Sequence, residues 1–559
     1  MSFDETFDVV VVGSGAAGLS VALTASIHGL SVLVIEKAAT LGGSTAISGG
    51  AVWVPGNPHL SEVGFTESRE AVLTYLRAIL GNRMNLPMIE TFLDRGPEMI
   101  SFLERNTELR LAPRAVSPDY QPDLPGAATG GRTLDPVVYD GKALGAAFTR
   151  LKRPLNEFLV FGGMMVNRKD IDMLLGATKT LPNFWGAAKL ILKYAADRIT
   201  HPRGTRLLMG NALAARLIKS ALNRNIPMRE NHAARDLILE EGRVAGLVVD
   251  TPQGERRLGA RRGVVFASGG FPGSAAMRDK LVPHARQHYS MAPQDNAGDG
   301  IGLGLDAGGT LGAENVGNAF WTPVSVMCEA DGREVRFPHL ILDRAKPGLV
   351  AVDQNGRRFV NESTSYHEFV EAMHRSPAAI PAFLVCDAKF LKTYGIGLVR
   401  PGPGSPRRYI DAGYLLTGNS IAELAAKIGV DPKNLAASVA EMNAAARSGK
   451  DRAFGKGSTA YNRYLGDAAH KPNPCLGPVE TAPFYAVKVF PGDIGTAAGL
   501  ETDTAARVLG KDGAPIPGLY ACGNDMNSIM AGSYPSAGIT LGPALTFGYI
   551  AGLSLAGKL

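Results

Sequence analysis

Residues 7–36 read FDVVVVGSGAAGLSVALTASIHGLSVLVIE, and this stretch decides the fold. The apolar, β-branched run Phe7–Val12 predicts a strand that is buried on both faces. Leu19–Gly29 predicts a helix that ends in glycine, and Ser31–Ile35 predicts a second buried strand. The segment is therefore a complete βαβ unit, which is the context that makes a glycine-rich turn informative.

The turn inside this unit has the glycine spacing of a dinucleotide site. Gly13 makes the tight turn, Gly15 lets the backbone approach a pyrophosphate, and Gly18 lets the helix pack closely on the strand. Ala16 and Ala17 lie at the positive end of the helix dipole, where the pyrophosphate is expected to bind. This pattern alone does not separate FAD from NAD.

Glu36 closes the second strand, where a carboxylate accepts hydrogen bonds from ribose hydroxyls and disfavours a 2′-phosphate. A second glycine-rich loop follows, and it can continue along a longer cofactor toward a flavin, which favours FAD. The cofactor-binding residues expected in this loop are Lys37, Gly42, Gly43, Ser44, Ser48, Gly49, Gly50 and Ala51. No histidine lies near Ser44 or Thr45, so we expect the FAD to be bound non-covalently.

Later segments repeat the pattern of a strand that runs into glycine. Residues 262–266 predict a strand before ASGGF, and residues 518–525 (GLYACGND) predict a strand that suits the ribityl and second phosphate portion of FAD. The cofactor-binding residues expected beyond the first two loops are Ala234, Ala267, Ser268, Gly269, Asn296, Asp299, Gly300, Gly523, Asn524, Gly538 and Leu541. The GLG of residues 302–304 follows no strand, so a nicotinamide site is not expected there. Electrons should then leave the flavin to an external acceptor such as a quinone.

Bulk composition narrows the class of protein. A chain of 559 residues is too long for one compact core. The net charge of +6, with no basic motif that contains interleaved aromatics, argues against a nucleic-acid partner. The four cysteines form no CxxC or Cys/His cluster, which argues against a metal site and a disulfide framework. The N-terminus lacks a basic segment and no apolar run reaches a membrane span, so we expect a cytoplasmic protein.

We expect an α/β fold whose Rossmann-type FAD-binding domain is split in sequence. Residues 1–325 and 491–559 form that domain, and residues 326–490 form an inserted α+β catalytic cap domain. The active site should lie at the junction of the two. Residues of about 150–206 look like an insertion in which apolar patches alternate with lysine and arginine. Two interpretations of it stay open: a helical subdomain packed on the core, or a segment in peripheral contact with the inner face of the membrane.

Motifs along nearly the whole chain resemble one family. GSGAAG with Glu36, GGST, SGG, ASGGF, NAGDG, GRRFVNE and GLYACGN followed by LGPALTFGYIAG are similar to the fumarate reductase/3-ketosteroid dehydrogenase flavoproteins. Within that superfamily, the segment Tyr534-Pro-Ser-Ala-Gly538 resembles the motif of the 3-ketosteroid Δ1-dehydrogenases. The family motif often has further glycines where this chain has Ser536 and Ala537, which could reshape the pocket.

The resemblance implies roles for four catalytic residues. The Tyr534 hydroxyl and the Gly538 N–H would bind the C3 carbonyl of a 3-ketosteroid and form an oxyanion hole for the developing enolate. Tyr366 would take the C2 proton while hydrogen-bonded to Tyr120, and flavin N5 would take hydride from C1. On position alone a loop tyrosine is more often a half-buried packing residue, and Gly538 can equally be the helix N-terminus that faces the flavin.

Rival functions stay open at this point. A 3-ketosteroid Δ4-(5α)-dehydrogenase also uses tyrosines around a C3 carbonyl, and sequence separates it poorly from a Δ1 enzyme. A fumarate-reductase-type enzyme binds a dicarboxylate with cations, but no lysine, arginine or histidine lies between Gly523 and Thr540. A flavin-binding sensor without turnover is the rival from a different class.

Overall fold

The computed structural model describes residues 2–156 and 159–559, so residues 157 and 158 of the expected insertion lie outside the described residues. The βαβ unit is present as β1 (Glu5–Val12), α1 (Ala16–Ile27) and β2 (Val32–Glu36). The helix begins three residues earlier than expected, directly after Gly15, because Ala16 and Ala17 favour helix and Gly18 is required by its close approach to the Gly13 carbonyl. The turn is therefore tighter than the sequence pattern alone indicates.

Both ends of the chain contribute to one eight-stranded sheet. Its central order is β10-β2-β1-β13-β12-β11, and β22 joins β13 on a branch that also carries β21. β1 pairs in parallel with both β2 and β13, and β22 pairs in parallel with β13 through Val264↔Leu519 to Phe266↔Ala521. The further strands are β10 (Met228–Glu230), β11 (Ala233–Glu240), β12 (Arg243–Thr251), β13 (Gly254–Phe266), β21 (Arg507–Leu509) and β22 (Pro515–Ala521).

The parallel strands of this sheet end at one edge. β1 ends at Val12, β13 at Phe266 and β22 at Ala521, so the loops that follow them lie together. In open α/β sheets, ligands bind outside the carboxyl ends of the strands. The last helix, α16 (Leu541–Ala556), packs against α1, where the Ser20 hydroxyl donates to the Leu545 carbonyl at 2.7 Å.

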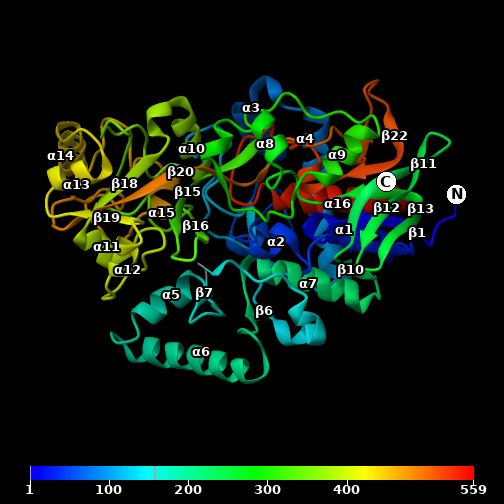
Figure 1. Cartoon of the computed structure of the whole chain (residues 1–559), viewed down its shortest axis with the longest axis horizontal. Coiled ribbons are helices and arrows are strands. Elements are labelled where there is room, and N and C mark those ends of the chain that lie inside the picture. Colours follow the sequence, from blue (N-terminus) through cyan, green and yellow to red (C-terminus); the bar gives the residue numbers. More distant parts are fainter. Residues whose placement is uncertain (1, 157–158) are drawn as a thin grey trace.

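A second, seven-stranded sheet lies at the opposite end of the molecule (Figure 1). Its order is β16-β15-β20-β18-β17, with β14 and β19 both paired to β20. The strands are β14 (Tyr289–Ser290), β15 (Ala319–Cys328), β16 (Glu334–Pro338), β17 (Leu349–Val352), β18 (Ala382–Asp387), β19 (Leu415–Gly418) and β20 (Phe484–Thr496). Both β15 and β20 are continuous strands of this sheet, so the expected boundaries at 325 and 491 fall inside them.

The expected insertion projects from one side of the molecule, below the two sheets in Figure 1. It contains β7 (Leu159–Val160), β8 (Met164–Met165), α5 (Arg168–Leu175) and α6 (Leu181–Thr200). Over the described part of the chain, no helix is both long enough and apolar enough to cross a membrane.

The remaining helices and short strands connect and cover the two sheets. They are α2 (Gly43–Ile47), β3 (Val52–Trp53), α3 (Arg69–Leu80), α4 (Leu86–Asn106), β4 (Leu111–Pro113), β5 (Thr133–Pro136), β6 (Tyr139–Asp140), β9 (Arg206–Leu207), α7 (Met209–Asn223), α8 (Ala275–Leu281), α9 (Asp299–Asp306), α10 (Tyr366–Arg375), α11 (Ala388–Tyr394), α12 (Arg407–Asp411), α13 (Ile421–Ile428), α14 (Pro432–Ser448) and α15 (Ala460–Leu465).

Candidate active site

The first glycine turn has no room for side chains at two of its three glycines. Gly13 has φ +109°, and a Cβ added there would lie 2.2 Å from the Ala267 carbonyl oxygen. A Cβ at Gly18 would lie 2.1 Å from the Gly13 carbonyl oxygen. Gly15 differs, because the nearest atom to a Cβ there is Thr45 Oγ1 at 3.6 Å. The turn is thus closely packed at Gly13 and Gly18, whereas there is space at Gly15, beside the N-terminus of α1. A pyrophosphate would lie in this space.

Glu36 lies beside this turn and is held by it. Its Oε2 accepts hydrogen bonds from the Ser14 N–H at 3.1 Å and from the Ser14 hydroxyl at 2.6 Å, and its Oε1 accepts from the Ala38 N–H at 3.0 Å. The N–H of His232 donates to the Glu36 carbonyl at 2.9 Å, which brings the start of β11, with Ala234, to the end of β2. The carboxylate is therefore fixed at the end of β2.

The second glycine-rich loop meets the first at α2. Thr45 Oγ1 accepts from the Ala16 N–H at 3.0 Å, and Ser44 Oγ accepts from Asn296 Nδ2 at 2.9 Å. Asn296 also donates to the Gly269 carbonyl at 3.2 Å, and Lys37 forms an ion pair with Asp299. The loops at 13–18, 37–51, 267–270 and 296–300 are thus joined side by side, although they are far apart in sequence.

The acid that follows β22 has a structural role in this arrangement. The fully buried Asp525 carboxylate accepts hydrogen bonds from the Gly270 N–H at 2.8 Å and from the Ser268 hydroxyl at 2.7 Å. Burial raises the pKa of Asp525, and these hydrogen bonds act in the opposite direction. Asp525 therefore clamps the ASGG loop, while the neighbouring Gly523 and Asn524 face a cavity.

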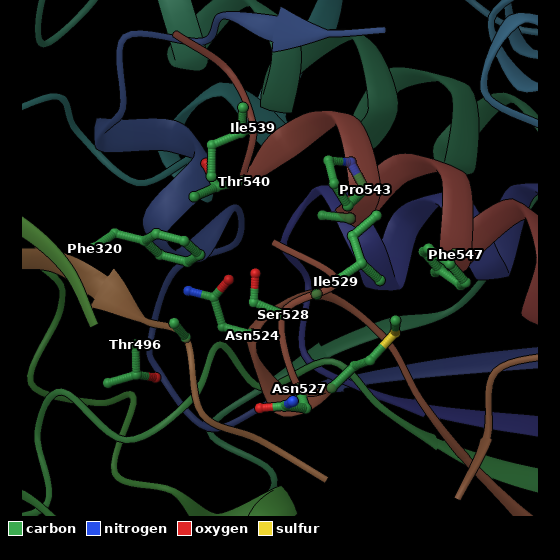
Figure 2. A pocket seen from close by; sticks show the side chains of 14 residues that line it. Phe320, Thr496, Asn524, Asn527, Ser528, Ile529, Ile539, Thr540, Pro543 and Phe547 are labelled. Atoms are coloured by element: carbon green, nitrogen blue, oxygen red, sulfur yellow. The ribbon is translucent and has the colours of Figure 1, made fainter. Parts of the chain in front are cut away.

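The N-terminus of α16 opens onto this cavity (Figure 2). The cavity is lined by Phe320, Thr496, Ala497, Gly523, Asn524, Met526, Asn527, Ser528, Ile529, Ile539, Thr540, Pro543, Ala544 and Phe547. Thr540 precedes the helix and no side chain caps it. An uncapped helix N-terminus carries partial positive charge, which suits the electron-rich end of a flavin. Together with the glycine cradle, these residues fit FAD.

Three tyrosines that are distant in sequence form one buried cluster. The Tyr120 hydroxyl donates to the Tyr366 hydroxyl oxygen at 2.8 Å. The Tyr120 ring stacks on the Tyr534 ring with centroids 5.3 Å apart and an interplanar angle of 9°, and the Tyr366 ring meets the Tyr534 ring edge-on at 5.3 Å. All three side chains are buried. The structure therefore brings together the tyrosines that the resemblance selects.

Local structure holds each tyrosine in place. Tyr366 is the first residue of α10, directly after a capping box in which Ser365 Oγ accepts from the Glu368 N–H at 3.2 Å. The Tyr120 N–H donates to the Pro535 carbonyl at 2.9 Å, and the Tyr75 hydroxyl donates to the same oxygen at 2.7 Å. The loop that carries Tyr120 is thus tied to the residue that follows Tyr534.

Burial controls the protonation of the cluster. It raises the pKa of Tyr534 to about 12, while the hydrogen bond with Tyr366 acts in the opposite direction. It raises the pKa values of Tyr366 and Tyr120 well above the ordinary value, and the hydrogen bond from Tyr120 partly offsets the shift at Tyr366. The resting cluster is therefore neutral near pH 7, and a base within it needs neighbours that stabilise the anion.

Gly538 lies between the cluster and α16. Its φ is +100°, and a Cβ there would lie 2.6 Å from the Trp53 backbone nitrogen. The Gly538 carbonyl accepts from the Trp53 N–H at 3.1 Å, which fixes the backbone. Phe320 joins the cluster to the cavity, because its ring lies 5.6 Å from the Tyr534 ring and also lines the cavity. A ring ketone held by Tyr534 would thus lie next to the place where the flavin fits.

Two further residues of the cluster were missed from sequence. The buried Tyr461, on α15, has its ring centroid 4.8 Å from that of Tyr120, and His367 has its ring 5.5 Å from Tyr534. No motif surrounds Tyr461, so the sequence carried no signal for it. His367 directly follows Tyr366, and this adjacency was the only available clue.

Comparison with known proteins also identifies an FAD-binding protein. A family model described as FAD binding domain matches residues 8–541. The chain is 40% identical to 4-oxocyclohex-2-ene-1-carboxylate 5-dehydrogenase of Sinomonas cyclohexanicum, over 98% of this chain and 93% of that protein. It is 38% identical to 3-oxosteroid 1-dehydrogenase of Mycobacterium tuberculosis (strain H37Rv), over 99% of this chain and 98% of that protein.

A solved structure is also closely similar. The crystal structure of 3-ketosteroid Δ1-dehydrogenase from Sterolibacterium denitrificans, in complex with 1,4-androstadiene-3,17-dione, has a TM-score of 0.92 and 37% identity, and the match covers 99% of this chain and 100% of that one. The protein is an FAD-dependent oxidoreductase of the class that dehydrogenates CH–CH groups. It belongs to the FAD-binding flavoprotein family and, within it, to the group of 3-ketosteroid dehydrogenases and their cyclic-ketone relatives.

Proposed function

We propose that this protein introduces the Δ1 double bond into 3-ketosteroids. The observation that carries the proposal is the hydrogen-bonded pair Tyr120–Tyr366, packed against Tyr534, whose ring meets Phe320 of the cavity at the N-terminus of α16. This arrangement supplies a donor for a carbonyl and an acceptor for a proton within one buried cluster. Both are needed to remove hydrogen from a carbon next to a ketone.

Tyr534 and Gly538 bind the C3 carbonyl in this proposal. The hydroxyl of one and the N–H of the other donate to the oxygen, and both bonds strengthen as negative charge develops there. Because Tyr534 stays protonated up to a pKa of about 12, it remains a donor at neutral pH. The positive φ of Gly538 sets the direction of its N–H.

Tyr366 accepts the C2 proton. The hydrogen bond that its oxygen receives from Tyr120 stabilises the negative charge at that oxygen. Bound FAD would supply the oxidant for the hydride at C1. The loops at 13–18, 37–51, 267–270 and 296–300, Gly523, Asn524 and the N-terminus of α16 would hold it non-covalently.

A second candidate substrate is a small cyclic ketone that carries a carboxylate, as the 40% identical relative acts on 4-oxocyclohex-2-ene-1-carboxylate. Such an anion needs a free cation once it is buried. Around the cluster, Arg114 is paired with Asp135, Arg132 with Asp119, and Arg344 donates to backbone carbonyls. Arg114 and Arg132 are thus neutralised by carboxylates. Arg344 keeps its charge, but its N–H donors are directed to backbone carbonyls, so it offers no open fork to a substrate carboxylate, which favours the uncharged steroid.

The test is anaerobic mixing of the purified flavoprotein with a 3-keto-4-ene steroid. Bleaching of the flavin band, together with a product conjugated across C1 and C2, is the expected result. Reaction of a 5α-saturated 3-ketosteroid at C4 and C5 instead would favour the Δ4-(5α) alternative. Faster bleaching by 4-oxocyclohex-2-ene-1-carboxylate than by any steroid would overturn the steroid assignment.

We further propose that a quinone reoxidises the flavin. The GLG of residues 302–304 lies inside α9 and follows no strand, whereas the glycines of a nicotinamide dinucleotide site follow a strand. This supports an acceptor other than a nicotinamide. Mixing the steroid-reduced enzyme with menadione should restore the flavin band, and NAD⁺ should not restore it. Reoxidation by NAD⁺ at a comparable rate would contradict the proposal.

Helix α6 supports peripheral contact with a membrane. Its exposed apolar side chains recur on one face of the helix: Leu181, Phe184, Trp185, Ile191, Leu192 and Ile199. Lys189, Lys193 and Arg198 lie on the same helix, while Ala187 and Asp197 are buried on the other side. Apolar surface flanked by basic residues suits the interface of an anionic bilayer.

Flotation with vesicles of phosphatidylserine and phosphatidylcholine tests this contact. Wild type should float with the vesicles, and the triple variant Leu181→Ser, Trp185→Ser, Leu192→Ser should not. The matched control replaces exposed apolar residues elsewhere, Val116, Leu239 and Val316, with serine and should still float. Equal flotation of all three proteins, or of none, would contradict the role of α6.

A further inference from the structure

Arg344 is a buried cation next to the tyrosine cluster. Only 2% of it is exposed, and its guanidinium lies over the ring of Phe369 on α10, 5.0 Å from the centroid. Its partners are backbone carbonyls: Nε donates to His339 at 2.8 Å, Nη1 to Glu362 at 3.0 Å and Thr364 at 3.1 Å, and Nη2 to Leu340 at 3.1 Å. Among the described residues, no carboxylate lies within ion-pairing distance of this guanidinium.

A buried charge without a counter-ion is costly, so its surroundings indicate what it faces. Burial lowers the pKa of Arg344, and the neighbours that oppose this shift are Tyr461, then Asp343, Tyr120 and Tyr366. The effect is reciprocal, because Arg344 lowers the pKa of Tyr461 against the effect of burial. The geometry agrees with this, because the guanidinium donates to the Thr364 carbonyl and lies over Phe369, one helical turn after Tyr366, so the charge lies beside the start of α10.

The other charged groups around the cluster are already engaged. Asp119 is paired with Arg132 at 2.6 Å, and Glu368 Oε2 accepts from the Ser365 hydroxyl at 3.0 Å in the α10 cap. Asp343 accepts from the Gly397 N–H at 3.1 Å and from the backbone N–H of Arg344 at 2.8 Å, and it lies 2.6 Å from His339 Nδ1. Burial raises the pKa of Asp343, whereas His339 and, more weakly, Arg344 lower it.

His367, the remaining titratable neighbour, accepts the Trp321 N–H at Nδ1 and has Glu371 3.5 Å from Nε2. Among the described charged groups around the cluster, Arg344 is thus the cation that forms no ion pair with a carboxylate.

We propose that Arg344 is a positioning residue whose charge stabilises the anionic form of the tyrosine cluster while Tyr366 accepts the C2 proton. This inference rests on the proposed function. The C2 proton moves to the Tyr366 oxygen, and bound FAD would supply the acceptor for the electron pair and hydrogen of the C1–H bond. A fixed positive charge in a low-dielectric surrounding lowers the cost of the tyrosinate on which the transfer depends.

A purely structural role makes a different prediction. The bonds from Arg344 to the Glu362 and Thr364 carbonyls hold the segment that leads into Tyr366 at the start of α10. If only these bonds mattered, Lys and Gln, which both keep N–H donors, would retain activity to a similar degree, and the pH dependence of the remaining activity would not change. If the charge matters, Lys preserves the pH dependence, whereas neutral residues displace it.

The experiment is the pH profile of steroid kcat for wild type and for Arg344→Lys, Arg344→Gln and Arg344→Met, each purified with its flavin. The ascending limb should move to higher pH by about one unit in the Gln and Met variants, and kcat on that limb should fall about tenfold. Arg344→Lys should keep the limb within about half a unit of wild type. KM should change little, since Tyr534 and Gly538 bind the ketone. Arg344→Gln removes the charge but retains N–H donors, so it tests the role of the charge if the Met variant does not fold.

Arg203→Met is the matched control. Arg203 is equally buried, lies over the Phe148 ring at 4.7 Å and donates to Asn211 at 2.9 Å, but it faces none of these tyrosines. The ascending limb of the kcat pH profile of Arg203→Met should coincide with that of wild type. An unmoved limb in Arg344→Gln, or an equal displacement in Arg344→Lys, would overturn the role of the charge. Absence of steroid turnover in wild type would instead refute the proposed function itself.

Discussion

At the scale of single residues, Tyr366 carries the sharpest prediction. Tyr366→Phe removes the oxygen that accepts the C2 proton and receives the hydrogen bond from Tyr120. We expect kcat to fall by about 10²- to 10⁴-fold, because general-base catalysis contributes a factor of that size. Anaerobic stopped-flow reduction of the flavin by steroid measures it. The control is Tyr485→Phe, a buried tyrosine on β20 outside the cluster, which should reduce its flavin at the wild-type rate.

Gly538→Ala tests the backbone of the carbonyl site. The new Cβ would lie 2.6 Å from the Trp53 backbone nitrogen at a positive φ, so the backbone has to move. We expect kcat/KM to fall by about 10²-fold, the cost of one lost oxyanion donor. Gly302→Ala on α9 is the control, since a Cβ there meets nothing within 4 Å. Unchanged steady-state kinetics in Gly538→Ala would argue against the proposed role of this N–H.

The sequence could predict the members of the cluster that lie in motifs, and only those. Tyr534 and Tyr366 each lie beside a conspicuous pattern, and the structure brings both to Tyr120. Tyr461 and Arg344 lie in segments without such patterns, and they reach the cluster only because α15 and the loop at 339–344 pack behind it. Proximity of this kind depends on tertiary packing, which local patterns do not contain.

At the scale of elements, the cap of α10 connects stability to activity. Ser365 accepts the Glu368 N–H, and Tyr366 is the first helical residue. Ser365→Ala should lower the free energy of unfolding by about 1 kcal/mol. It should also lower kcat, because a frayed first turn moves the Tyr366 oxygen. Denaturant titration and steady-state kinetics measure the two effects.

Ser420→Ala provides the matched control for this cap. Ser420 caps α13 by accepting the Glu423 N–H at 3.1 Å, away from the cluster. The variant should show a similar loss of stability with unchanged kcat. If both variants lose kcat equally, the effect at α10 reflects general destabilisation and not the position of Tyr366.

The elements also show where sequence patterns stop being informative. The βαβ unit was predicted within a few residues, because its apolar runs end at glycines. The expected domain boundaries at 325 and 491 fall inside β15 and β20 instead. Both strands are apolar and continuous, so no change of composition marks the residue where the chain leaves one sheet for the other.

At the scale of the whole molecule, the α/β fold class and the FAD-binding family are confirmed. Strand β22 returns the chain to the sheet that β1 began, so segments from both ends flank the cofactor loops. A cofactor that touches both ends should stabilise the whole fold, since binding to the native state alone raises its stability by mass action. Histidines pack against β15 and β20, and this junction has a pH dependence of its own.

The pKa of His374 is the basis for predicting how stability depends on pH. Burial is the largest of the causes that lower its pKa to about 3; the nearby His288 and His284 act in the same direction, and Glu371 opposes them. Its ring lies 5.0 Å from Trp321 of β15, and its Nε2 is buried without a hydrogen-bond partner. His288, which lies 2.9 Å from Asp493, also has a pKa lowered by burial. The junction thus holds two histidines that are neutral in the folded state.

A histidine whose pKa is lowered by folding binds its proton more readily in the unfolded chain. Between about pH 6.5 and pH 3, the unfolded state therefore takes up more protons, and stability falls as the pH falls. Denaturant midpoints at pH 7.5 and pH 5 should show this loss in wild type, and His374→Asn should show a smaller one. His232→Asn, in which a half-buried histidine outside the junction is replaced, should lose as much as wild type. An equal loss in His374→Asn would place the acid sensitivity elsewhere.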